Sequence, residues 1–294
     1  MEDVWARVFT YLSPREVRKC ERVSRTWRRL AHRALRQLVD VDFERDFQNA
    51  IADPDHLERI LRLCSRRLKR VTFRVTSKNE KYSVFASEHH LTKSVVEALA
   101  TTATALQSIV IDRMYCSTPE VNEIVQLALR QLLCQSPRLK RFEIVGRGWT
   151  FDHFVLDETV LLLLPPSLRD LSISAGGSLK ITNLHFLRGK QLESLALQRS
   201  FISSADLVVL ADMALSLTTL DLTSCINISD GTLLGQLHNL RRLVSEPFSI
   251  KGYQFARSRV CLCECHDGLA ADSIAVDVVV VVVVRRRCDE SIGE

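Results

Sequence analysis

The order of apolar and polar positions in LTTLDLTSCINISDGTLLGQL, residues 217–237, predicts a strand, a turn and a helix in succession. Leu220 and Leu222 lie two residues apart, so they point to the same side of an extended chain. Leu234 and Leu237 then recur at a helical spacing. A unit this short carries its apolar residues on one side only and cannot bury them alone. It therefore needs copies of itself above and below.

The pattern apolar-x-x-apolar-x-apolar recurs along most of the chain. The copies are Leu68-Val71-Phe73, Leu106-Ile109-Ile111, Leu139-Phe142-Ile144, Leu168-Leu171-Ile173, Leu192-Leu195-Leu197 and Leu217-Leu220-Leu222, with a partial copy at Leu240 and Leu243. The later copies are about 23–25 residues apart, within the range of leucine-rich repeats, which is about 20–29 residues. An ordinary α/β domain whose strands share the pattern is the alternative. So many copies favour an α/β solenoid (horseshoe), with parallel strands on its concave face and helices outside.

Another pattern precedes the repeats, in VWARVFTYLSPREVRKCERVSRTWRRLAHRAL at residues 4–35. Val4, Val8 and Leu12 are four residues apart, which predicts one helix. Ser13 and Glu16 form a capping box with Pro14 at the first helical position, which predicts a second helix. A third helix is predicted from an apolar stripe with helical spacing, made of Val23, Trp27, Leu30, Ala34 and Leu38.

Three short helices bury too little apolar surface to be stable alone, so we expect them to dock on the repeats, on a partner protein or on both. Trp27 fits either a core role or a partner-facing role. An arginine ridge runs opposite the stripe if the helix is continuous: Arg18, Arg22, Arg25, Arg29, Arg33 and Arg36. A nucleic-acid contact and a solvated face toward an acidic partner both fit the ridge. The lack of interleaved aromatic residues favours the second, and we expect no nucleic acid.

Composition narrows the class of protein. The chain has 294 residues, 26% of them charged, and a net charge of +5. No apolar segment follows Met1, and the valine run at 278–284 is too short to span a bilayer, so we expect no membrane association and a cytoplasmic or nuclear protein.

Nine cysteines are an odd number and are expected to stay reduced. The cluster Cys261-Leu-Cys263-Glu-Cys265-His266 leaves zinc as an alternative, but its spacing is unlike that of zinc sites.

No motif supports an enzyme, a metal or a cofactor. GRGW at 146–149 and SAGGSLK at 174–180 lack the frame of a phosphate-binding loop. His89 and His90 have no carboxylate at metal-binding spacing. His153 and Asp157 fall on one helical face, a placement that is common by chance. A Cys–His nucleophile pair stays open, since such a pair is formed in space rather than in sequence.

The first forty residues resemble an F-box. The residues that carry the likeness are Val4, Val8-Phe9, Tyr11-Leu12, Pro14, Val17, Cys20, Val23-Ser24, Trp27 and Leu30-Ala31. The repeats, with LTTLDLTSCINISDG, resemble the cysteine-containing class of leucine-rich repeat. An F-box usually opens with Leu-Pro, which is absent before Met1-Glu2-Asp3-Val4, so we expect an N-terminally truncated F-box. The expected division is an F-box at 1–40, a helical linker at 41–67, repeats at 68–256 and a low-complexity, disordered tail at 257–294.

This combination is similar to the substrate-recognition subunits of SCF-type ubiquitin ligases. The resemblance implies a non-catalytic subunit that binds a Skp-type adaptor and cullin through the F-box and a target protein through the repeats. A repeat scaffold that recruits no ligase is the alternative. The adaptor-binding residues implied are Val4, Phe9, Leu12, Pro14, Val17, Cys20, Val23, Trp27 and Leu30. For the target we expect the concave strand face, with Arg70, Arg74, Arg141, Glu143, Ser172, Ser194, Gln198 and Asp221.

Overall fold

The structure is a computed structural model of the whole chain. It describes residues 2–47, 54–64, 67–73, 95, 97–99, 105–114, 119–146, 156–174, 184–198, 200, 202–223, 225, 234, 236–245, 261–262 and 280–283. The chain divides into two compact units, residues 1–179 and 180–294. Each unit has its own set of parallel strands, and each is described separately below.

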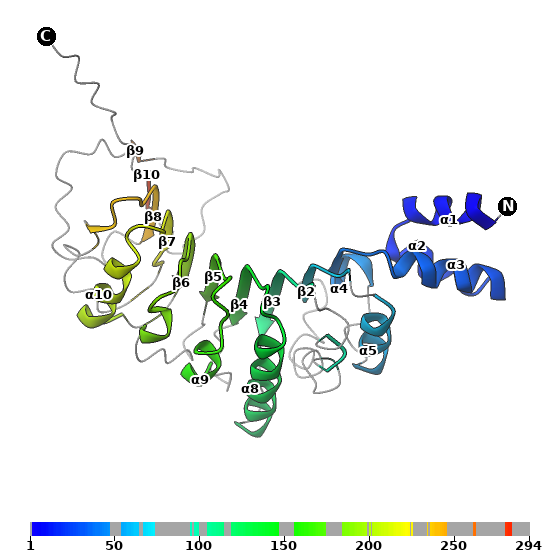
Figure 1. The fold of residues 1–294 in the computed structure, drawn as a ribbon, viewed down its shortest axis with the longest axis horizontal. Coiled ribbons are helices and arrows are strands. Elements are labelled where there is room, and N and C mark those ends of the chain that lie inside the picture. Colours follow the sequence, from blue (N-terminus) through cyan, green and yellow to red (C-terminus); the bar gives the residue numbers. More distant parts are fainter. Residues whose placement is uncertain are drawn as a thin grey trace, which may run out of the picture. The chain divides into compact units, whose positions relative to one another are not determined.

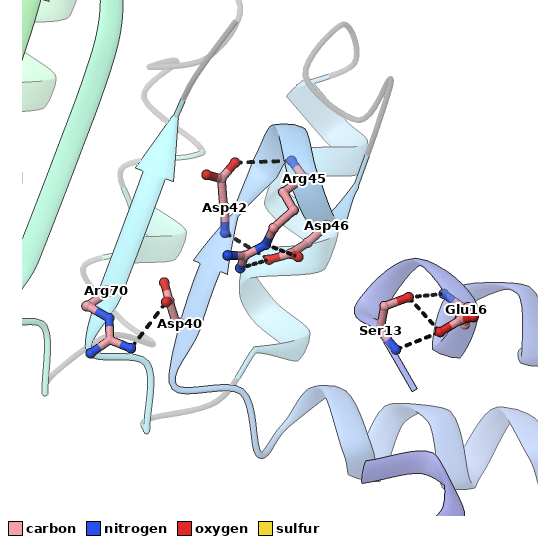
Figure 2. A network of polar contacts seen from close by, with 7 residues as sticks. All are labelled: Ser13, Glu16, Asp40, Asp42, Arg45, Asp46 and Arg70. Atoms are coloured by element: carbon pink, nitrogen blue, oxygen red, sulfur yellow. Dashed lines mark hydrogen bonds and ion pairs between the residues drawn. The ribbon is translucent and has the colours of Figure 1, made fainter. Parts of the chain in front are cut away.

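The first unit begins with three helices, as the sequence predicts: α1 (Glu2–Tyr11), α2 (Pro14–Cys20) and α3 (Arg25–Leu35). Helix α3 contacts both α1 and α2. The predicted capping box is confirmed, because the Ser13 hydroxyl accepts from the Glu16 amide while the Glu16 carboxylate accepts from the Ser13 amide (Figure 2). The Ser13 hydroxyl also donates to the Glu16 carboxylate at 2.8 Å, and this bond, with the one from the Ser13 amide, lowers the pKa of Glu16.

The third helix is shorter than its apolar stripe. Ser24 is its N-cap, and its hydroxyl accepts from the Trp27 amide at 3.1 Å. Val23 precedes the helix and Leu38 follows it. The arginine ridge is therefore not continuous, since Arg18 belongs to α2, Arg22 to the turn, and Arg25, Arg29 and Arg33 to α3.

Five parallel strands follow in the first unit: β1 (Asp40–Asp42), β2 (Arg70–Phe73), β3 (Ser108–Met114), β4 (Arg141–Gly146) and β5 (Asp170–Ser174). They pair in chain order. Between them lie α4 (Phe43–Asp46), α5 (Pro54–Leu63), α8 (Pro119–Cys134) and α9 (Glu158–Leu161). In Figure 1, α5, α8 and α9 lie on the same side of these strands.

The strand register confirms the phase of the repeats. The middle apolar position of each copy aligns with its neighbours in one column, and this column is buried: Val41, Val71, Ile109, Phe142 and Leu171. The next apolar position forms a second buried column of Phe73, Ile111, Ile144 and Ile173. Equivalent residues of successive repeats thus lie one strand spacing apart and pack on one another. This stacking buries the apolar residues that a single repeat would leave exposed.

Strand β1 is a repeat strand that the sequence analysis did not include. Leu38, Val41 and Phe43 match the repeat pattern one copy before Leu68. The ring of Phe43 stacks on Phe73 at a centroid distance of 5.1 Å and lies 5.9 Å from Phe47. Both Phe43 and Phe47 are buried, so β1 and α4 cover the first apolar end of the repeats.

A polar cluster fixes this cap, and Figure 2 shows it. The buried Asp46 carboxylate accepts the Asp42 amide at 3.0 Å and two guanidinium N–H groups of Arg45, each at 2.8 Å. The Arg45 amide donates to Asp42 Oδ1 at 3.1 Å. This bidentate pair raises the pKa of Arg45 and leaves the buried carboxylate satisfied.

The second unit has three parallel strands: β6 (Ser194–Gln198), β7 (Thr219–Asp221) and β8 (Arg242–Ser245). It also contains the short 3-10 helix η3 (His185–Leu187) and α10 (Ser204–Asp212). Leu195, Leu220 and Leu243 form its buried column. The repeat cysteine Cys225 is buried, and its thiol donates to the Leu197 carbonyl of the preceding repeat.

The tail contains two short strands, β9 (Cys261–Leu262) and β10 (Val280–Val283). Strand β10 is antiparallel to both β8 and β9. Part of the valine run thus forms a strand, one of the two conformations, strand or disorder, that its composition allows. Among the helices that the structure describes, none has the length and apolar character that crossing a membrane requires.

Candidate protein-interaction surfaces

The three N-terminal helices enclose a small core. Phe9, Val17, Leu30, Ala31 and Leu35 are buried in it. The half-buried Trp27 ring lies 5.3 Å from the Trp5 ring and meets Phe9 edge-on at 5.5 Å. Trp27 therefore supports the packing of α1 on α3, while its half-buried ring keeps part of its surface accessible.

Helix α1 also carries a face that this core does not cover. Val4 is 64% exposed, Trp5 39%, Val8 40% and Tyr11 88%. Val4, Val8 and Tyr11 recur at spacings of four and three, which places them on one side of the helix. We refer to Val4, Trp5, Val8 and Tyr11 as the α1 apolar face. Val23, in the turn between α2 and α3, is 62% exposed as well.

The nine residues predicted to bind an adaptor fall into three groups. Val4 and Val23 are exposed, and Leu12, Pro14, Cys20 and Trp27 are half-buried. Phe9, Val17 and Leu30 are buried, so in this structure they form the core beneath the surface. The candidate set omitted Trp5, Val8 and Tyr11, although the helical spacing from Val4 was the signal that could have found them.

The helical segment that carries the α1 apolar face is basic. Arg22, Arg25, Arg28 and Arg33 are exposed on or near α3. The Arg18 guanidinium instead pairs with Glu21 at 2.6 Å. This distribution gives the helical segment a positive field that favours an acidic partner.

The second surface is the outward face of the strands. In the first unit, one row of this face contains Asp40, Arg70, Ser108, Arg141 and Asp170 in register. Oppositely charged side chains pair on this face, since Arg70 lies 3.2 Å from Asp40 in the same row and Arg141 lies 2.7 Å from Glu143 in another row. The two arginines are thus oriented by carboxylates on or beside their own strands.

The structure brings some of the predicted target-binding residues together. Glu143 is aligned with Ser172 across β4 and β5 in the first unit. In the second unit, the Gln198 amide donates to the Asp221 carboxylate at 2.8 Å, while Ser194 is aligned with Thr219. Arg70 and Arg141 are separated by the intervening strand β3. Arg74 lies outside the described residues.

Two titratable groups with shifted pKa values, Cys64 and Asp157, serve structure. Burial raises the pKa of the Cys64 thiol to about 12. Asp157 caps α9: its carboxylate accepts from the Thr159 amide and hydroxyl and pairs with Arg130, and these contacts lower its pKa. Among the described residues, no group of three or more His, Cys, Asp or Glu is placed to hold a metal ion. The cysteines at 263 and 265, the histidines at 89, 90 and 153, and most of both glycine motifs lie outside that part of the chain.

Comparison with protein-family models identifies the kind of domain that the N-terminal helices form. Residues 2–38 match the family model of the F-box-like domain. The match begins and ends with the three-helix segment, so the F-box-like unit is α1–α3. F-box domains generally bind Skp-type adaptors, and F-box and leucine-rich-repeat folds are typically non-catalytic interaction modules.

Two solved structures resemble the chain. An internalin from Listeria monocytogenes has 17% identity and a TM-score of 0.37, and the match covers 64% of this chain and 50% of the internalin. A leucine-rich-repeat protein from Leptospira interrogans has 12% identity and a TM-score of 0.26, covering 68% of this chain and 63% of that protein. The chain thus spans only part of each. A search of curated proteins found no match.

The fold is an α/β combination of an F-box-like helical segment and parallel strands built from repeats. The strand register and the buried columns described above carry the repeat assignment.

Proposed function

We propose that this chain is the substrate-recognition subunit of an SCF-type ubiquitin ligase. The F-box-like helices would bind a Skp-type adaptor and, through it, a cullin, while the repeats bind a target protein. The chemistry of ubiquitin transfer then takes place elsewhere in the assembly. The contribution of this chain is proximity, because it holds the target near the charged enzyme.

One observation carries the proposal: the α1 apolar face stays exposed on a three-helix unit that matches the F-box-like family. Its members are 39–88% exposed although the residues beneath them are buried. Burying a side chain such as valine contributes roughly 1.5–3 kcal/mol, so an apolar face of four residues is a strong site for a protein partner. The basic surroundings on α3 suit an acidic adaptor.

The cellular location belongs to the same proposal. Cys64 is buried as a free thiol, and Cys20 and Cys134 are free as well. Free thiols persist where the cytosol and nucleus keep cysteine reduced, which suits a ligase subunit of either compartment.

Pull-down of a purified Skp-type adaptor and cullin by the full chain tests the proposal. We expect the wild-type chain to retain both proteins. Val8→Glu should reduce adaptor binding at least tenfold, because it places a charge at the centre of the α1 apolar face. The control is Ile124→Glu on α8, where the side chain is 53% exposed and the adaptor should bind as in the wild type.

Two results would contradict the proposal. A wild-type chain that retains neither adaptor nor cullin would favour the alternative, a repeat scaffold without ligase recruitment. Equal loss of binding in Val8→Glu and Ile124→Glu would show that the adaptor does not use the α1 apolar face. Circular dichroism of both variants checks that the helices are intact.

A further inference from the structure

The tetrapeptide Arg-Leu-Lys-Arg occurs twice in this chain, at residues 67–70 and 138–141. The structure places both copies at the same position of the repeat, at the start of β2 and of β4. The leucine of each copy is fully buried, and the three basic residues of each copy are exposed. The leucine is explained by the repeat core, whereas the core requires none of the basic residues. We call residues 67–70 and 138–141 the double basic edge.

Backbone hydrogen bonds fix the separation of the two copies. The Lys69 carbonyl accepts the amides of Gln107 and Ser108 at 2.8 and 2.9 Å. The Gln107 carbonyl in turn accepts the amides of Lys140 and Arg141 at 2.8 and 2.9 Å. Strand β3 therefore separates the copies, which places them two strand spacings apart, or about 10 Å.

The basic side chains of the double basic edge differ in their hydrogen-bond and ion-pair partners. Arg67 donates to the Gln37 side chain at 2.6 Å. Arg70 and Arg141 pair with Asp40 and Glu143, as described above. In the part of the chain that the structure describes, Lys69 and Lys140 have no carboxylate at ion-pair distance. Two ammonium groups, at equivalent positions of two strands, are thus available to an external anion.

We propose that the double basic edge binds an acidic stretch of the target protein in an extended conformation. A chain extended as a polyproline II helix has three residues per turn and rises about 3.1 Å per residue. Carboxylates three residues apart then lie on the same side and span the roughly 10 Å between Lys69 and Lys140. This inference deepens the proposed function by giving the target a chemical class and a site beside the strand face. It rests on target recognition by the repeats and does not depend on adaptor binding.

A peptide fits this edge better than a nucleic acid. Proteins that bind single strands combine a basic groove with aromatic side chains on which bases stack. The residues at the starts of the four strands, 67–70, 105–108, 138–141 and 167–170, include no aromatic residue. The acidic side chains Asp40, Glu143 and Asp170 also interrupt the positive charge, which disfavours a continuous phosphate backbone.

Fluorescence anisotropy with the full chain tests the inference. The probe is a labelled twelve-residue peptide with glutamate at every third position in a Gly/Ser background, compared with its glutamine counterpart and with a twelve-nucleotide oligo-uridine. We expect the glutamate peptide to bind more tightly than the other two. Binding should weaken between 50 and 200 mM salt, because salt screens exposed charges.

Variants locate the site. Lys69→Gln and Lys140→Gln should each raise the Kd of the glutamate peptide about two- to fivefold, the range of exposed ion pairs, and the double variant should raise it about tenfold. The matched control is Arg241→Gln, an exposed basic residue just before strand β8 in the second unit, which should leave the Kd unchanged.

Three results would overturn the inference: equal binding of the glutamine peptide, equal effects of the lysine variants and Arg241→Gln, or tighter binding of oligo-uridine. The last result would identify a nucleic-acid partner. The double lysine variant should still retain the adaptor. If the adaptor binds while the acidic peptide does not, this inference fails and the proposed function stands.

Discussion

At the residue scale, the burial of each cysteine determines how accessible and how reactive its thiol is. Cys64 follows α5 and is fully buried, and burial raises the pKa of its thiol to about 12. Cys225 is buried at the strand end, where its thiol donates to a backbone carbonyl. Cys134, at the end of α8, is exposed. Two of these three cysteines thus contribute to packing, and their thiols are shielded from reagents.

Brief alkylation with iodoacetamide at neutral pH should distinguish these cysteines. Since the thiolate is the nucleophile, Cys134 should be modified while Cys64 and Cys225 stay largely unmodified until the chain is unfolded. Peptide mass spectrometry measures the extent at each site. Modification of Cys64 in the native chain as fast as that of Cys134 would contradict its burial.

At the element scale, short polar motifs fix where helices begin. Ser13 with Glu16 caps α2, and Ser203 with Asp206 caps α10 by the same reciprocal arrangement. Asp157 caps the four-residue helix α9 and joins it to α8 through Arg130, whose guanidinium lies 2.7 Å from the carboxylate and also donates to the Thr159 hydroxyl. Sequence spacing had paired Asp157 with His153, but its contacts in the structure assign it a capping role.

Replacing Asp157 should destabilise the first unit in a way that depends on pH. Asp157→Ala removes the cap and the ion pair and should cost about 1 kcal/mol, whereas Asp157→Asn keeps a capping oxygen and should cost less. The folded pKa of Asp157 is lowered, so the stabilisation by its charge is present above the unfolded pKa of about 3.9 and is lost as the pH falls through the folded value.

Chemical denaturation of the wild type and both variants at pH 7 and in the acid range measures this effect. The difference between the wild type and Asp157→Asn should shrink on acidification. A difference that stays constant down to the lowest pH at which the chain folds would mean that the charge of Asp157 contributes nothing.

At the scale of the whole molecule, the end of the repeat stack needs a cover. In the first unit, β1 pairs with β2, and α4 brings Phe43 and Phe47 over the exposed end of the core. The segment between the F-box-like helices and the first predicted repeat is thus itself a repeat strand with a cap. The repeats should depend on this segment more than on the helices before it.

Two truncations separate these contributions. A chain lacking residues 1–37 keeps β1, Phe43 and Phe47, and we expect its repeats to unfold at a Tm close to that of the full chain. A chain lacking residues 1–53 loses them, which exposes the edge of β2 and the ring of Phe73. Its Tm, followed by circular dichroism, should fall by several degrees, since each kcal/mol shifts Tm by roughly 2–4 °C in a domain of this size. Equal Tm values would show that β1 and α4 are not a cap.

The sequence by itself determined the features that depend on local periodicity. The phase of the repeats follows from residues such as Val71, Ile109 and Phe142, because every copy must bury the same positions to stack on its neighbours. The beginning of α2 follows from Ser13 and Glu16, because a capping box is made by residues three apart. Such signals lie within a few residues of one another, so they can be read without the fold.

Only the tertiary structure decided which apolar and charged groups remain at the surface. Phe9 and Tyr11 lie two residues apart on α1, yet Phe9 is 1% exposed and Tyr11 88%, because only one side of the helix packs against α3. Leu38, Val41 and Phe43 carry the repeat pattern, but only the pairing of β1 with β2 showed that this copy belongs to the stack. The two basic tetrapeptides are 71 residues apart in sequence, and the stacking of the repeats brings them within two strand spacings. Burial and proximity depend on neighbours that are distant in sequence, and these neighbours are set only when the chain folds.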